Sequence, residues 1–226
     1  MNPDVNSGVP KVEHPEDYLL LVSVLNDASD DDTARNEVAN LLQRSKYPRL
    51  ADALCKVLDN PAEKPRFRSF VAQHLGLLAA GEDAVQREEA KAKLHECLSD
   101  RHVEVRREAL LALVRVKDPQ AAKLAVELLN SAALEAGATR DLAIRCVHDL
   151  DLRDQIPAVR KYVRHPDNVI RIAAIVALSQ WGDEESRPAF EEAAQSKTVR
   201  LQRAGKAAME RLDAQKVPVE QPAPKE

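Results

Sequence analysis

The chain has 226 residues, of which 44% are apolar and only 3% aromatic, so it is long enough to bury a sizeable core. Charged residues make up 31% of the sequence but nearly cancel, and the net charge of −4 with a pI near 5.9 argues against a general nucleic-acid binder. The sequence has few aromatic residues, six glycines and little alternation of β-branched residues. Because strands favour aromatic and β-branched residues, this composition favours helices over sheets.

The two ends of the sequence differ from its middle. Residues 1–15 hold three prolines, and residues 215–226 form a proline-rich polar segment, so we expect both to be disordered tails. The N-terminal residues lack the basic start and apolar stretch of a signal peptide, and the longest apolar run, residues 172–178, is too short to span a membrane. These features predict a cytoplasmic protein without membrane association. We expect residues 16–214, between the tails, to form one domain.

Between the tails, almost every stretch carries apolar residues at helical spacing. In chain order the expected helices cover residues 16–25, 34–42, 48–58, 67–75, 84–98, 103–114, 119–129, 139–147, 153–163, 170–178, 184–194 and 199–208. Asp118 and Asp183 are candidate N-cap residues, and Pro119, Pro157 and Pro188 lie in first turns, where proline is tolerated. The pattern therefore predicts twelve helices in six hairpins.

The second helix of every expected hairpin carries an arginine near its start, at intervals of 29 to 38 residues. These repeated arginines are Arg35, Arg68, Arg106, Arg140, Arg171 and Arg200. In the first five helices a valine or alanine follows three positions later, and a leucine or valine seven positions later, so both fall on one helix face. Because a single hairpin cannot bury such faces alone, the repeat predicts a stack of hairpins, an α-solenoid.

The segment LSDRHVEVRREALLAL, residues 98–113, resembles the HEAT-repeat family, in particular the short HEAT-like repeats of the phycobilin lyase type. The resemblance covers residues 16–214 and implies an all-α, right-handed α-solenoid of about six hairpins. It also implies that the repeated aspartate and arginine hydrogen-bond between neighbouring repeats as a buried ladder. On this chain the ladder positions would be Arg35, Arg68, Asp100, Arg106, Arg140 and Arg171. The repeated arginine is thus interpreted as architecture.

No catalytic or cofactor motif stands out in the sequence. It contains no glycine-rich phosphate loop, no GxSxG and no HExxH. One His-Glu pair, His95 and Glu96, cannot complete the di-iron site of HEAT-like hydroxylases. The three cysteines lie in expected helices and are interpreted as small buried residues. We therefore expect no enzyme activity, no metal and no cofactor.

A binding surface is expected on the second helices, which usually line the concave side of HEAT arrays. Positions one, five and nine after the repeated arginine point away from the core. In the middle hairpins these positions combine arginines with aliphatic residues, a composition common in protein-binding patches. The residues concerned are Arg107, Leu111, Arg115, Arg145, Ile172 and Val176. The alternative, that curvature buries the aliphatic residues and the charges form only a solvated face, stays open at this point.

Together these observations predict a monomeric, noncatalytic HEAT-repeat scaffold or adaptor that binds a protein or peptide partner and no nucleic acid. The alternative function is that of a bilin lyase-like or related HEAT-repeat enzyme that acts with a partner subunit.

Overall fold

The computed structural model describes residues 15–131 and 140–216. These residues form twelve α-helices and two short 3-10 turns, and none of them lies in a strand. The expectation of an all-α chain with twelve helices is therefore confirmed. Apart from Pro15, Gln215 and Lys216, which are helical, the expected tails lie outside the described residues. The helices fall into two compact units that divide after Asp118.

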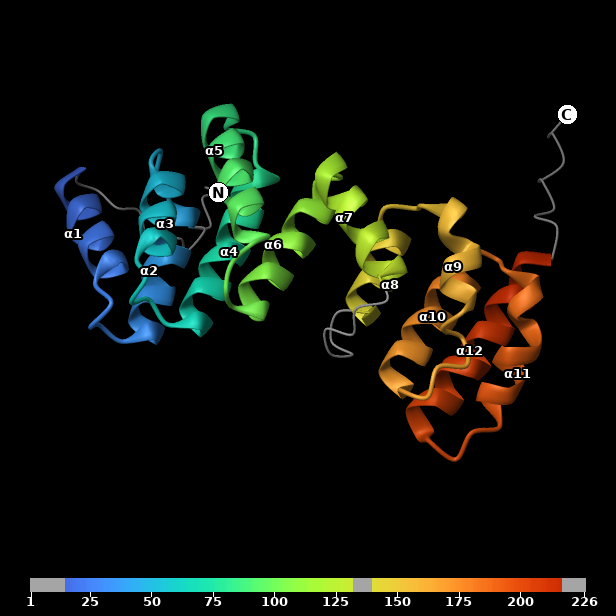
Figure 1. Cartoon of the computed structure of the whole chain (residues 1–226). Helices are drawn as coiled ribbons and strands as arrows, with labels where there is room; N and C mark the ends of the chain where they lie inside the picture. Colours follow the sequence, from blue (N-terminus) through green and yellow to red (C-terminus); the bar gives the residue numbers. More distant parts are fainter. Residues whose placement is uncertain (1–14, 132–139, 217–226) are drawn as a thin grey trace, which may run out of the picture. The chain divides into compact units, whose positions relative to one another are not determined.

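The first unit contains three hairpins. They are α1 (Pro15–Asn26) with α2 (Asp32–Arg44), α3 (Leu50–Asp59) with α4 (Pro65–Ala79), and α5 (Ala84–Cys97) with α6 (Val103–Arg115). The first helices α1, α3 and α5 pack in one layer, and the second helices α2, α4 and α6 pack in another (Figure 1). Each helix contributes at least one fully buried leucine to the core between the layers, among them Leu25, Leu42, Leu54, Leu75, Leu94 and Leu113.

The second unit also contains three hairpins, and the first helices of the last two, α9 and α11, are short. They are α7 (Pro119–Asn130) with α8 (Arg140–Asp149), α9 (Ile156–Arg160) with α10 (Asn168–Gln180), and α11 (Arg187–Ala194) with α12 (Val199–Lys216). The 3-10 turns η1 (Arg153–Gln155) and η2 (Glu184–Ser186) lead into α9 and α11, where Pro157 and Pro188 occupy the first turn. Helix α10 packs between α8 and α12 in the layer of second helices.

Four second helices end in the same way. The residue eleven positions after the repeated arginine has a left-handed backbone, and the residue after it donates its N–H to the carbonyl five positions earlier, which closes a Schellman motif. The left-handed residues are Lys46 (φ 55°), Lys117 (φ 54°), Asp151 (φ 51°) and Gly182 (φ 76°). Only one of the four is glycine, so three hairpins carry a residue with a Cβ in a conformation that favours glycine.

The last hairpin departs from the expected register. Helices α2, α4, α6 and α10 each begin three residues before their repeated arginine, whereas α12 begins at Val199, so its equivalent position is Gln202. The structure agrees with this shift, because Leu201 and Gly205 are buried while Arg200 is exposed. A Cβ at Gly205 would lie 2.3 Å from the backbone nitrogen of Ala194, so α11 and α12 require glycine at their crossing. The assignment of Arg200 to the repeated arginines is therefore wrong.

Candidate functional site

The repeated arginines join each hairpin to the next within a unit. Arg35 is fully buried and donates from Nε to the carbonyl oxygen of Leu25, at 3.0 Å, near the end of α1. Its two terminal nitrogens donate to the carboxylate of Glu63, at 3.1 and 2.5 Å, in the hairpin that follows. The guanidinium also lies 3.8 Å from the ring centroid of Phe67. Arg35 thus binds an otherwise free helix carbonyl and a buried carboxylate at once.

Arg68 repeats this arrangement in the second hairpin. It donates to the carbonyl oxygen of Leu58, at 2.6 Å, and to the carboxylate of Asp100 in the third hairpin. Burial alone would raise the pKa of Asp100, but the hydrogen bonds from Arg68 and the backbone of His102 outweigh burial and hold it below its ordinary value. Arg106 donates to the backbone carbonyl of Asp100, at 2.9 Å, and not to its carboxylate.

In the second unit the acceptor in the next hairpin is a hydroxyl for Arg140 and a carboxylate for Arg171. Arg140 donates to the carbonyl oxygen of Leu129, at 2.8 Å, and to the hydroxyl of Tyr162 in the next hairpin, at 2.7 Å. Arg171 donates to the carboxylate of Glu192 on α11, at 2.7 Å. These bonds connect neighbouring hairpins.

Among the described residues, two features bear on chemistry: metal-ligand clusters and thiols. No cluster of three or more His, Cys, Asp or Glu side chains among them could hold a metal ion. Burial raises the pKa of Cys55 to about 12 and that of Cys97 to about 11, so both thiols stay protonated at neutral pH and are poor nucleophiles. Across the described ranges, no helix combines the length and apolar content needed to cross a bilayer.

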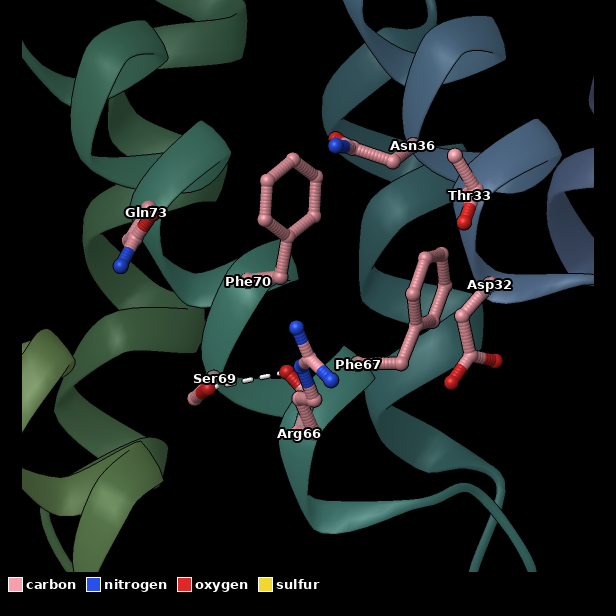
Figure 2. Close-up of a pocket in the computed structure, with 8 residues that line it drawn as sticks. All are labelled: Asp32, Thr33, Asn36, Arg66, Phe67, Ser69, Phe70 and Gln73. Carbon is pink, nitrogen blue, oxygen red and sulfur yellow. Dashed lines mark hydrogen bonds between the residues drawn. The ribbon is translucent and has the colours of Figure 1, made fainter.

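A first hollow lies between α2 and α4 and has a volume of about 440 Å³. It is lined by Asp32, Thr33, Asn36, Arg66, Phe67, Ser69, Phe70 and Gln73. Figure 2 shows Asn36 of α2 facing Phe67 and Phe70 of α4 across the space between the helices. Arg66 stands at its edge and is exposed, while the Ser69 hydroxyl is bonded to the Arg66 carbonyl. The hollow therefore combines an aromatic wall with polar side chains.

A second hollow lies between α8 and α10, with a volume of about 270 Å³; we call it the α8–α10 groove. It is lined by Asp141, Arg145, His148, Val169, Ile172, Ala173, Val176 and Ala177. The wall that α10 provides is wholly apolar, and Val169 and Val176 remain 61% and 38% exposed. On the α8 side, Arg145 pairs with Asp141 at 2.9 Å. The groove is thus an exposed aliphatic strip beside one ion pair.

The structure brings together three of the six residues proposed for partner binding. Arg145, Ile172 and Val176 all line the α8–α10 groove. The other three lie on α6 in the first unit, where Arg107 and Leu111 are half-buried and Arg115 is exposed at the end of the helix. They occupy the outward positions one, five and nine after the repeated arginine of that helix, Arg106.

The two hollows occupy equivalent positions of the repeat. Counted from the repeated arginine, positions −2, +1 and +5 line both: Arg66, Ser69 and Gln73 on α4, and Val169, Ile172 and Val176 on α10. Sequence reasoning considered positions +1, +5 and +9 only, and so missed Val169 at −2 and Phe70 at +2. Because −2 and +2 lie beside +1 and +5 on a helix, a wider window on the same face would have included them.

Helical hairpins stacked in two layers define the class of helical-repeat, or α-solenoid, proteins. A family model described as HEAT repeats matches residues 62–136 and 132–210, and the chain belongs to this family. No curated protein matches the sequence.

Solved structures with similar folds share under 20% of the sequence. A designed armadillo repeat protein in complex with the peptide (KR)4 is 19% identical, with a TM-score of 0.53, over 85% of this chain and 98% of that one. One chain of the complex of CpcE and CpcF of phycocyanin lyase from Nostoc sp. PCC7120 is 19% identical, with a TM-score of 0.57, over 92% of this chain and 80% of that one. At this identity the similarity concerns the fold.

Proposed function

We propose that this protein is a noncatalytic HEAT-repeat scaffold that binds a protein or peptide on the outward face of its second helices. The observation that carries the proposal is the α8–α10 groove, in which Val169, Ile172 and Val176 form an aliphatic strip that folding leaves open to solvent. Neighbouring exposed aliphatic residues that flank a charged side chain are typical of interaction sites.

The size of the groove favours a macromolecular partner. A hollow of about 270 Å³ is below the usual range for a small-molecule site but holds one or two side chains of a larger partner. The similar structures give further support. The designed armadillo protein was solved with a bound peptide, and CpcE and CpcF were solved in complex with each other. In this proposal Arg107, Leu111 and Arg115 supply an additional contact surface on α6.

A comparison of two exposed valines tests the proposal. Val176→Asp places a charge in the groove, and Val85→Asp places the same charge on α5, where Val85 is 77% exposed. Proteins captured by the immobilised wild-type chain are quantified by mass spectrometry, and the affinity of the most enriched one is then measured in purified form. We expect Val176→Asp to weaken binding at least about tenfold, because the partner would remove water from the new carboxylate without pairing it. We expect Val85→Asp to have no effect on binding. Equal binding by both variants, with unchanged circular dichroism melts, would contradict the proposal.

The second candidate is a bilin lyase-like enzyme that acts with a partner subunit. The fold similarity to one chain of the CpcE and CpcF complex, over 92% of this chain, supports it. An absorbance scan after incubation with a bilin separates the two candidates. A pigment band that remains with the protein after gel filtration favours the enzyme, and its absence favours the scaffold.

A further inference from the structure

We infer that the partner of the α8–α10 groove is an acidic amphipathic peptide segment, whose aliphatic side chains fill the groove and whose carboxylates face α12. This inference rests on the proposed function and specifies the chemistry of the partner. It depends on the corrected register of α12, on the charges that this register exposes, and on the length of the aliphatic strip.

The corrected register places two arginines on α12 at the repeat positions that line the groove on the neighbouring helix α10. With Gln202 at the repeated position, Arg200 and Arg203 of α12 occupy positions −2 and +1, the same positions that Val169 and Ile172 hold on α10. Helices α10 and α12 are neighbours in the layer of second helices. Both arginines are exposed, and neither has an ion-pair partner within the part of the chain that the structure describes. Their charges are therefore available to a ligand.

The charge around the groove is uneven. Helix α10 contains no acidic residue, and α12 contains none before Glu210. Glu192 of α11 already accepts hydrogen bonds from Arg164 and Arg171. On the opposite side of the groove the charge of Arg145 is balanced by Asp141. The uncompensated positive charge thus lies on the α12 side, which complements a peptide with acids on that side and repels a basic one.

The strip on α10 sets the apolar part of the ligand. Val169 and Val176 are seven residues apart, which corresponds to about 10 Å along a helix, with Ile172 and Ala173 between them. A strip of this length contacts two or three aliphatic side chains on one face of a short peptide. The geometry therefore selects a peptide in which aliphatic residues alternate with, or lie beside, aspartate or glutamate.

A display library tests this inference. Random 12-residue peptides are displayed on phage and selected on the full chain, and the enriched peptides are synthesised with a fluorescent label. Their affinities are measured by anisotropy for five proteins: the wild type, Val169→Ser with Val176→Ser, Arg200→Glu with Arg203→Glu, Arg200→Gln with Arg203→Gln, and a matched control. The control, Lys123→Glu with Lys161→Glu, makes the same change of net charge at exposed positions on or next to the first helices α7 and α9.

The expected result has three parts. The enriched peptides contain acids next to aliphatic residues, Arg200→Glu with Arg203→Glu weakens their binding about tenfold, and the lysine control leaves it unchanged. Binding to the wild type also weakens as sodium chloride rises from 50 to 500 mM, and Arg200→Gln with Arg203→Gln gives an intermediate loss. Circular dichroism melts check that each variant is folded.

Two other results have distinct meanings. Peptides that lose affinity with the serine variant but not with the glutamate variant, or an enrichment of basic peptides, would overturn the acidic partner and leave the proposed function standing. An absence of any peptide whose binding depends on Val169 and Val176 would overturn both.

Discussion

A fully buried arginine is costly unless all of its charge is compensated, and Arg35 shows how this chain meets that requirement. Its guanidinium is bonded to the carbonyl oxygen of Leu25 and the carboxylate of Glu63 and lies over the ring of Phe67. Glu63 is itself only 2% exposed, so each charge depends on the other. The pair therefore matters for stability mainly because either partner alone would be a buried, uncompensated charge.

Replacing Arg35 with alanine should destabilise the protein by about 3 to 5 kcal/mol, because Glu63 is left buried without its counter-ion. Urea denaturation followed by circular dichroism measures this change. As a control, Arg49→Ala removes an arginine whose ion pair with Asp52 is exposed and should cost less than about 1 kcal/mol. Similar midpoints for both variants would mean that Arg35 is not part of the buried network.

A second prediction concerns His74 on α4 and the pH dependence of stability. It is 3% exposed, its Nδ1 lies 2.6 Å from Oε1 of Gln43, and burial lowers its pKa from 6.5 to about 4. At a pH between these two pKa values, His74 binds a proton in the unfolded chain but not in the folded chain. The free energy of unfolding therefore falls, by up to about 3 kcal/mol, as the pH is lowered from 6.5 to 4. His74→Gln should flatten this part of a plot of urea midpoint against pH, and an unaltered slope would contradict the burial of a neutral imidazole.

At the scale of the element, the ends of the second helices are the feature least visible in the sequence. Lys46, Lys117 and Asp151 adopt a left-handed backbone that sequence alone associates with glycine, which only Gly182 supplies. The common position, eleven residues after the repeated arginine, becomes evident only when the structure gives the backbone angles.

Lys46→Gly should therefore stabilise the protein by about 0.5 to 1 kcal/mol, because glycine has no Cβ to strain the left-handed conformation. Gly182→Ala should have the opposite sign, since it introduces that strain. Thermal melts of the two variants should shift in opposite directions, and a lower melting temperature for Lys46→Gly would show that its side chain contributes more than the strain costs.

The helices and their pairing could be predicted because apolar residues recur at helical spacing and the repeated leucines, such as Leu75 and Leu113, lie in the core. The register of α12 could not be found from a search for the repeated arginine. Arg200 resembles that arginine in sequence, but the helix begins only at Val199 and Gln202 takes the equivalent place. Burial of Leu201 distinguishes the two registers, and burial is a property of packing rather than of the local sequence.

The candidate site was predictable in part for a similar reason. Counting outward positions from the arginine identified Arg145, Ile172 and Val176, because these positions face away from the core in any such hairpin. It did not identify the hollow between α2 and α4, since Phe67 is a core residue by spacing and yet also forms the wall of a hollow. Which outward positions are hollowed depends on side-chain size on the neighbouring second helix.

At the scale of the whole molecule, each of the two units is a set of three hairpins in which every hairpin contacts its neighbours. In such repeats stability comes from contacts between adjacent hairpins, and the repeated arginines supply bonds of this kind within both units. The proposed binding places different demands on the same helices, because it would use the positions that these contacts leave free. The outward face of α10 can therefore vary its chemistry without changing the fold.

Site-specific photo-crosslinking tests the central claim, that the α8–α10 groove binds a partner, most directly. Benzoylphenylalanine replaces Val176 in one protein and Val85 in another; the two valines are exposed on α10 and α5, respectively. Each protein is irradiated in extract of the cells that produce it, and adducts are identified by mass spectrometry. We predict a discrete adduct from position 176 that is absent from position 85 and is lost when Val169→Asp is added. Equal adducts from both positions, or an adduct from position 85 alone, would contradict the claim.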